Sequence, residues 1–149
     1  MSVSTKAVEL EWVGSEKSKG FHIIGKDYNN HNELFRLKRY TIWFSNQIEI
    51  HERRTTTSRD NDDYDKVTLL PYSSVEYITL ELHTISYLEK IRKTFTLRFC
   101  NKEREVFSLK DSIIDADFTS EVQKEFFRIQ LNSQNELEKK KKELEVITS

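Results

Sequence analysis

The sequence predicts an α+β fold that is mainly β, with six to seven antiparallel strands in a partly open barrel or sandwich capped by one C-terminal helix. Up to about Leu109, apolar and polar side chains alternate at period two, which is typical of half-buried strands. After Ser120 the apolar residues recur at helical spacing. A series of strands followed by one helix excludes the alternating order of Rossmann-type folds.

Turns between these strands must depend on Asn, Asp and Ser, because the chain has only 3 Gly and 1 Pro. The first long strand is predicted over Leu34–Phe44, which is rich in aromatic and β-branched residues. Gln47–Arg54 follows after the short Ser45-Asn46 link, so these two segments form a predicted hairpin. Earlier strands are expected at Phe21–Gly25 and Ala7–Val13.

The second half of the β region begins with a short strand, Val67–Leu70, that stops at Pro71, a residue unable to donate within a central ladder. Ser74–Ile85 then alternates regularly. A second hairpin turns at Asn101-Lys102 into Glu103–Leu109. The side chains expected to face the core are Ile78, Leu80, Leu82, Phe95, Leu97, Phe99, Phe107 and Leu109.

The helix is predicted to begin at Ser120, which has a Gln three residues later and so fits a capping box. Val122, Phe126 and Ile129 form its apolar stripe. Each of these side chains contributes roughly 1.5–3 kcal/mol when buried, so the helix should dock on the sheet. After Leu131 the pattern fades, and the charged tail is expected to be a solvated, fraying helix end.

Composition excludes several classes of protein. The formal net charge is −1, and a nucleic-acid-binding domain normally carries a basic excess, so no nucleic-acid partner is expected. The single Cys100 cannot form an internal disulfide. The chain starts without a signal-peptide pattern and has no run of about 18 apolar residues. A cytoplasmic location is therefore expected.

The stretch Val67–Leu82 carries a family resemblance. Within it, Leu70-Pro71-Tyr72-Ser73-Ser74-Val75 resembles the I-P-Y-x-x-I phrase that precedes a long strand in bacterial pleckstrin-homology-like domains. The flanking hairpins and the final helix also follow the order of that family. The resemblance implies a partly open barrel or sandwich with a capping helix. It further implies a scaffold that binds proteins, lipids or its own copies, and it does not imply an enzyme.

This resemblance divides the chain into three parts. Residues 33–131 form the expected pleckstrin-homology-like domain. Residues 1–32 are expected to be an N-terminal arm or added strand. Residues 132–149 are expected to be a charged helical extension or a frayed tail.

Chemistry-bearing motifs are weak. The acidic run Asp60–Asp65 resembles a calcium loop, but Asp65 stands where the turn glycine is needed and Pro71 where the bidentate Glu is needed, so an acidic hairpin tip is predicted. The four His lack metal-ligand spacing, and Cys100 has no neighbouring His. We therefore expect no metal, no cofactor and no catalysis, with an enzyme of unrecognised site as an alternative.

Two groups of residues are candidates for binding. The first is basic and would meet an anion or an acidic partner, although interleaved Glu residues favour ordinary solvent-exposed charge. The second is aromatic and would form an interface, together with an exposed sheet edge. The basic candidates are Arg36, Lys38, Arg39, Arg92 and Lys93, and the interface candidates are Tyr40, Trp43 and Phe44.

The function expected from these features is a non-catalytic module that binds a protein partner or associates with its own copies. A small neutralising protein, such as an immunity or phage anti-defence factor, is one alternative, because compact charged domains without cofactors suit that task. A second alternative is an anionic lipid-headgroup binder that uses Arg36, Lys38 and Arg39. Peripheral membrane contact is the lesser expectation.

Overall fold

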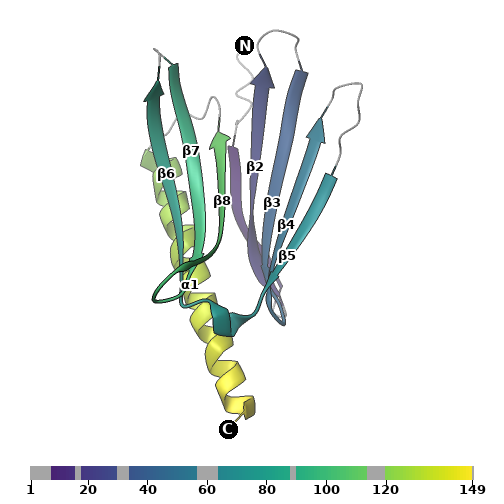
Figure 1. Ribbon diagram of the computed structural model, residues 1–149, viewed down its shortest axis with the longest axis vertical. Coiled ribbons are helices and arrows are strands. Elements are labelled where there is room, and N and C mark those ends of the chain that lie inside the picture. The colour runs from purple at the N-terminus through teal and green to yellow at the C-terminus, as the bar shows by residue number, and fades with distance from the viewer. Residues whose placement is uncertain are drawn as a thin grey trace.

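The computed structural model describes residues 8–15, 18–29, 34–56, 64–87, 90–113 and 120–148. Within these residues the chain forms eight strands, one short 3-10 helix and one long α-helix. Figure 1 shows how they are arranged. In chain order the elements are β1 (Val8–Gly14), β2 (Lys19–Asn29), β3 (Leu34–Phe44), β4 (Ile48–Thr56), β5 (Tyr64–Leu70), η1 (Tyr72–Ser74), β6 (Tyr77–Tyr87), β7 (Lys90–Cys100), β8 (Glu105–Ile113) and α1 (Ser120–Thr148).

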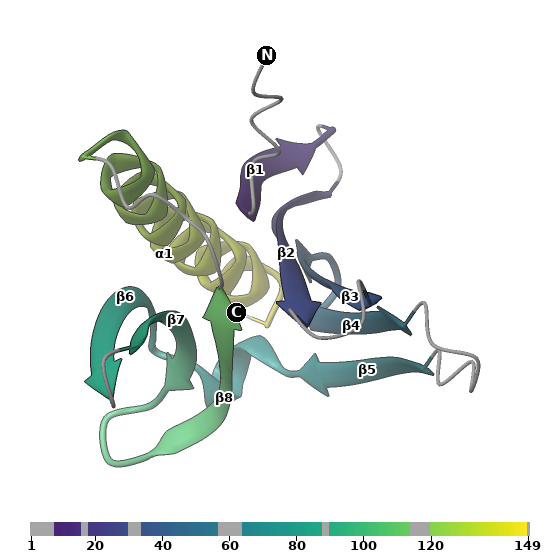
Figure 2. The same cartoon turned by 90° about the horizontal axis from the view of Figure 1, so that it is seen from above.

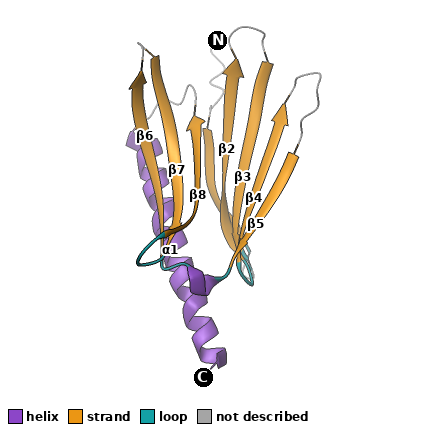
Figure 3. Cartoon of the chain, viewed as in Figure 1, coloured by secondary structure: helices purple, strands orange, loops and turns teal. Residues whose placement is uncertain are grey.

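The strands form two antiparallel sheets, which we call sheet A and sheet B (Figure 3). Sheet A has the order β1-β2-β3-β4-β5, and sheet B has the order β6-β7-β8. The expected mainly β fold with a C-terminal helix is confirmed. The strand number differs from the predicted six to seven, because both early segments pair in full. The two sheets are hydrogen-bonded separately rather than joined in a closed barrel.

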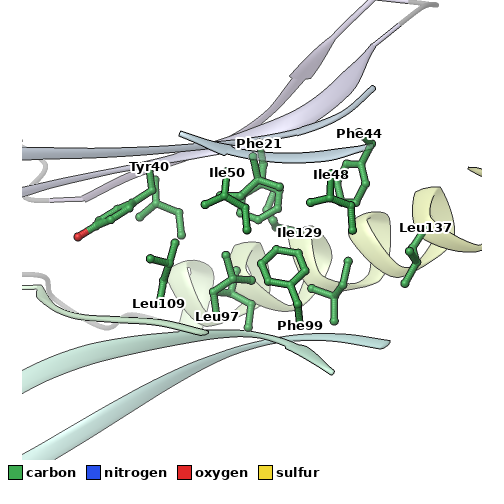
Figure 4. Close-up of a cluster of buried hydrophobic side chains, with 14 of the residues drawn as sticks. Phe21, Tyr40, Phe44, Ile48, Ile50, Leu97, Phe99, Leu109, Ile129 and Leu137 are labelled. Atoms are coloured by element: carbon green, nitrogen blue, oxygen red, sulfur yellow. The ribbon is translucent and has the colours of Figure 1, made fainter. Parts of the chain in front are cut away.

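The core lies between the inner faces of the two sheets (Figure 4). Period-two alternation determines it, since every second side chain of a strand points to the same face. The predicted core residues Ile78, Leu80, Phe95, Leu97, Phe99 and Leu109 are buried, and Leu82 and Phe107 pack against them partly buried. Sheet A supplies Phe21, Ile23, Tyr40, Ile42, Phe44, Ile48, Ile50 and Leu70.

The first two strands belong to the same core as the rest of sheet A. Phe21 of β2 is fully buried, and Trp12 of β1 packs on it with ring centroids 6.4 Å apart. The Trp12 ring also lies 6.1 Å from that of Phe44 in β3. The described part of residues 1–32 therefore supplies two strands whose side chains lie in the core or pack against it.

The helix α1 runs alongside β6 in the opening between the two sheets and also contacts β1 (Figure 2). It begins at Ser120, as the capping pattern predicted, and Phe126 and Ile129 are buried as expected. It does not fade after Leu131, because Ser133 and Leu137 continue the buried stripe. The Ser133 hydroxyl donates to the Ile129 carbonyl at 2.7 Å, so a polar residue sits in that stripe without an unpaired group.

Between β5 and β6, η1 carries the chain from sheet A to sheet B, directly after Pro71. Tyr72 is buried there, and its hydroxyl donates to the Ser45 carbonyl at the β3–β4 turn over 2.6 Å. Burial, and then the nearby carboxylates of Glu136, Glu143 and Glu49, raise the pKa of Tyr72 above its usual 10.0. The end of β5 is thus anchored to sheet A.

Candidate interaction surface

Strand β5 is an open edge of sheet A. It pairs with β4 along its whole length, from Ile48↔Leu70 to Arg54↔Tyr64. Sheet A ends at β5, and β4 is its one extensive neighbour in the described part of the chain. The unpaired side of an edge strand presents a row of N–H and C=O groups that can accept another strand.

Two apolar side chains stand next to this open backbone. Val67 is 52% exposed and Leu69 is 50% exposed, whereas Leu70 is buried. The alternation of the strand places both residues on the outer face of sheet A. We call the open edge of β5 together with Val67 and Leu69 the β5 surface.

The outer face of sheet A extends the β5 surface toward the middle of the sheet. Leu69 lies opposite Glu49, which lies opposite Trp43, which lies opposite Gly20. A Cβ at Gly20 would stand 2.9 Å from Trp43 Cε3 and 2.1 Å from the Ile42 carbonyl oxygen. Only glycine therefore allows β2 to pass this close, and the half-buried indole lies over it.

Charge and proline limit the β5 surface at its two ends. Asp65 and Lys66 are exposed at one end, and Pro71 follows the strand at the other. Arg53 Nε lies 3.8 Å from Asp65 Oδ1, but both side chains are mostly exposed, so the pair contributes little. Lysine at an edge discourages non-specific strand pairing. The apolar open segment is therefore the short run 67–70.

The edge of sheet B formed by β6 is closed by α1. The N–H of Ile78 donates to Gln134 Oε1 at 2.9 Å, and the N–H of Leu80 donates to Gln130 Oε1 at 2.8 Å. Gln134 Nε2 in turn donates to the Glu76 carbonyl at 3.1 Å. Four residues of a helix rise about 6 Å, and two residues of a strand rise about 6.6 Å. These spacings nearly match, so two glutamines four residues apart on α1 can bond the amides of alternate residues on β6.

The two remaining edges also have neighbours. Strand β1 has α1 beside it, and β8 lies close to β2. Of the four sheet edges in the described residues, β5 is therefore the one without an extensive neighbour on its outer side.

The predicted interface residues do not form one surface. Tyr40 and Phe44 are buried in the core, and the Tyr40 ring packs edge-on against Phe95 with centroids 5.7 Å apart. Trp43 lies an odd number of residues from both Tyr40 and Phe44, so strand alternation places it on the opposite, outer face. An aromatic-rich strand thus serves mainly the core, and Tyr40 and Phe44 are not available to a partner in this fold.

The predicted basic residues lie on opposite sheets. Arg39 is exposed on β3 of sheet A, directly opposite Arg53 on β4. Lys93 lies on β7 of sheet B and is half-buried. The remaining three, Arg36 and Lys38 on β3 and Arg92 on β7, have their backbone in the strands, and their side chains lie outside the described part. No described contact joins the two clusters.

A polar group that the sequence analysis missed lies at one end of the core. Glu52 is only 6% exposed, and its Oε2 has no hydrogen-bond partner among the described residues. It lies opposite Tyr40 and Lys66 in the register of sheet A. The Tyr40 hydroxyl donates to Asp111 Oδ2 on sheet B. A buried carboxylate oxygen without a hydrogen-bond partner costs stability, and alternation alone does not reveal it.

Histidines within the described residues pair with glutamates. His51 Nε2 lies 3.3 Å from Glu49 Oε1, and His83 Nε2 lies 3.2 Å from Glu81 Oε2. His22 likewise faces Glu11 at 3.7 Å. No group of three or more His, Cys, Asp or Glu suited to a metal occurs in these residues. His31 and the part of the acidic run at 60–63 lie outside them.

Cys100 is buried and lies directly opposite Tyr77. A hydrogen bond with the Cys100 thiol raises the pKa of Tyr77 above its usual 10.0. A phenol in this state stays protonated at neutral pH, so it is not a base that activates a thiol. The described surroundings of Cys100 are those of a packed side chain.

No helix in the described ranges combines the length and the apolar character needed to cross a bilayer. No protein-family model, no curated protein and no solved structure matches the chain.

Proposed function

We propose that this chain is a non-catalytic interaction module that binds an extended segment of a protein partner at the β5 surface. The observation that carries the proposal is the open edge of β5 with Val67 and Leu69 half-exposed beside it. Strand addition at such an edge derives affinity from main-chain hydrogen bonds and specificity from alternate side chains. The short length of the edge favours a partner strand of four or five residues, by this argument.

The proposal includes the pleckstrin-homology-like fold implied by the phrase Leu70-Pro71-Tyr72 and a cytoplasmic location. Two antiparallel meanders followed by a helix across their opening are consistent with that family. The phrase itself forms the end of β5 and the start of η1. It therefore belongs to the segment that anchors the proposed binding edge.

The chemistry of the β5 surface indicates what a partner strand must carry. Apolar side chains at alternate positions would cover Val67 and Leu69 on the outer face. A residue that tolerates a neighbouring ammonium group would lie opposite Lys66. A partner strand with this pattern gains burial of both half-exposed side chains.

A matched pair of variants tests the proposal. Val67→Lys with Leu69→Lys places charge on the β5 surface, where it should block strand addition. Phe127→Lys with Leu131→Lys is the control, because these α1 side chains are 65% and 51% exposed. Wild-type and both variant proteins are immobilised and incubated with a native extract, and the retained proteins are quantified.

We expect retention of a partner, or of the chain's own copies, by the wild type and the α1 variant, and its loss from the β5 variant. Equal retention by all three proteins, or no specific retention by the wild type, would overturn the proposal.

A further inference from the structure

Symmetry restricts how two copies of β5 can pair with each other. Antiparallel pairing of identical strands places a two-fold axis perpendicular to the sheet, so the outer face of one copy continues into the outer face of the other. Residues that lie opposite each other then share a face, and the axis passes through one residue of the strand. For the open part of β5 the possible centres are Lys66, Val67, Thr68 and Leu69.

Charge and side-chain pairing distinguish these registers. A centre at Lys66 sets two ammonium groups directly opposite each other, which is destabilising. A centre at Val67 sets Asp65 opposite Leu69 of the other copy, so a carboxylate loses water against an apolar side chain. A centre at Leu69 sets Pro71 opposite Val67, and proline has no N–H to donate.

The centre at Thr68 avoids all three conflicts. Val67 of each copy lies opposite Leu69 of the other, which covers both half-exposed side chains twice over. Thr68 meets Thr68, a favourable cross-strand pair. Lys66 lies opposite Leu70, where its methylene stem can pack while its ammonium group reaches water. Pairing spans residues 66–70 and ends before Pro71.

We infer, on the basis of the proposed function above, that the occupant of the β5 surface is the β5 strand of a second copy, paired antiparallel about Thr68. The formal net charge of −1 leaves little long-range repulsion between copies. The interface is small, because stable interfaces bury about 1,200–2,000 Å² and a strand pair of this length buries less. The dimer should therefore be weak and reversible.

Sedimentation equilibrium over a wide concentration range tests the self-association. The mean mass of the wild type should rise from that of a monomer toward that of a dimer as the concentration increases. The Phe127→Lys, Leu131→Lys control should show the same rise as the wild type. The Val67→Lys, Leu69→Lys variant should remain a monomer throughout. A rise in mass that is equal in all three proteins would place the association elsewhere and overturn the inference.

Single cysteine substitutions test the register. Thr68→Cys should form an intermolecular disulfide under mild oxidation at least about fivefold faster than Val67→Cys, since only a self-paired position brings two Cβ atoms within disulfide range. The wild type is the background control, because its Cys100 is buried. A faster reaction of Val67→Cys would overturn the assigned centre.

The two proposals fail in different ways. A wild type that stays monomeric at every concentration, yet retains another protein through Val67 and Leu69, overturns the self-pairing and supports strand addition by a foreign segment. Loss of both behaviours overturns both proposals.

Discussion

Strands β5 and β6 flank η1, and each is the edge strand of its sheet. The two edges differ in what lies beside them. The amides of Ile78 and Leu80 on β6 are occupied by Gln134 and Gln130 of α1. No helix lies along β5 in the described structure. An exposed edge invites pairing with other chains, and proteins usually cover or charge it. The β6 edge is therefore closed by the chain's own helix, and the β5 edge is left open in the described residues.

Outward side chains on the two edge strands follow the same division. On β6 the outer face carries Glu81 and His83, and His83 Nε2 lies 3.2 Å from Glu81 Oε2. On β5 the corresponding positions are Val67 and Leu69, both half-exposed. An apolar face beside an unpaired backbone is suited to strand addition, whereas a charged face beside a capped backbone is suited to solvent.

Opening the β6 edge should have the largest effect. Replacing Gln130 and Gln134 together by Ala removes three hydrogen bonds to the β6 segment. We expect the free energy of unfolding to fall by about 2–4 kcal/mol, because a buried backbone group left unpaired costs about 1–3 kcal/mol. Urea denaturation measures this, with Asn135→Ala, an exposed amide residue on the same helix, as a control. Equal midpoints for both variants would show that water closes this edge as well as glutamine does.

Removing the anchor at the end of β5 should have a smaller effect. Tyr72→Phe loses the hydrogen bond to the Ser45 carbonyl, which should cost about 0.5–1.5 kcal/mol at pH 7. The pKa of Tyr72 is raised in the folded protein, so its contribution is fully present below the unfolded value of 10.0 and is lost as pH rises above it. Urea midpoints between pH 7 and 10.5 should fall less steeply for the variant. Midpoints that fall equally with pH in the wild type and the variant would exclude a role for the Tyr72 phenol. Tyr77 is present in both proteins, so its titration does not affect the comparison.

Removing the charge at the β5 edge should strengthen association modestly. Lys66→Thr replaces an ammonium group opposite Leu70 in the proposed pairing, and a cross-strand pair is worth about 0.2–1 kcal/mol. The pair occurs twice, so the gain is about 0.4–2 kcal/mol and the dimerisation constant should rise about two- to thirtyfold. Sedimentation equilibrium measures it, and replacement of the exposed Lys110 on β8 by Thr (Lys110→Thr) is the control. An unchanged constant would argue against Lys66 lying in the interface.

The smallest effect is expected for monomer stability in the β5 variant. Val67→Lys with Leu69→Lys should change the free energy of unfolding by about 0.5 kcal/mol or less, because both side chains are half-exposed in the monomer. Urea denaturation at low protein concentration measures this. A large loss would mean that these residues support the fold rather than a contact.

Local patterns in the sequence account for much of the fold. The alternation of Ile78, Leu80 and Leu82 predicted an inward face, and two of the three are fully in the core. The pattern of Ser120 and Gln123 predicted a helix start at Ser120, and α1 is described from that residue. The sequence of β3 does not show which of its faces is buried. Period two separates Tyr40 and Phe44 from Trp43, but both faces carry aromatic side chains.

The continuation of α1 beyond Leu131 and the burial of Glu52 were not visible in the sequence. Ser133 lies in a buried stripe because its hydroxyl bonds within the helix, so its polarity conceals its position. Glu52 belongs to the inward set of β4, yet a carboxylate normally marks the solvent side. In both cases the neighbours that decide burial come from distant parts of the chain.

By itself the sequence determined the spacing of apolar residues, and therefore which segments are strands, where the helix begins and which side chains form the core. Only the tertiary structure decided which edge is closed and which is open. Gln130 and Gln134 reach residues 50 and 56 positions earlier in the chain. An edge is defined by what lies beside a strand, and periodicity describes only the strand itself.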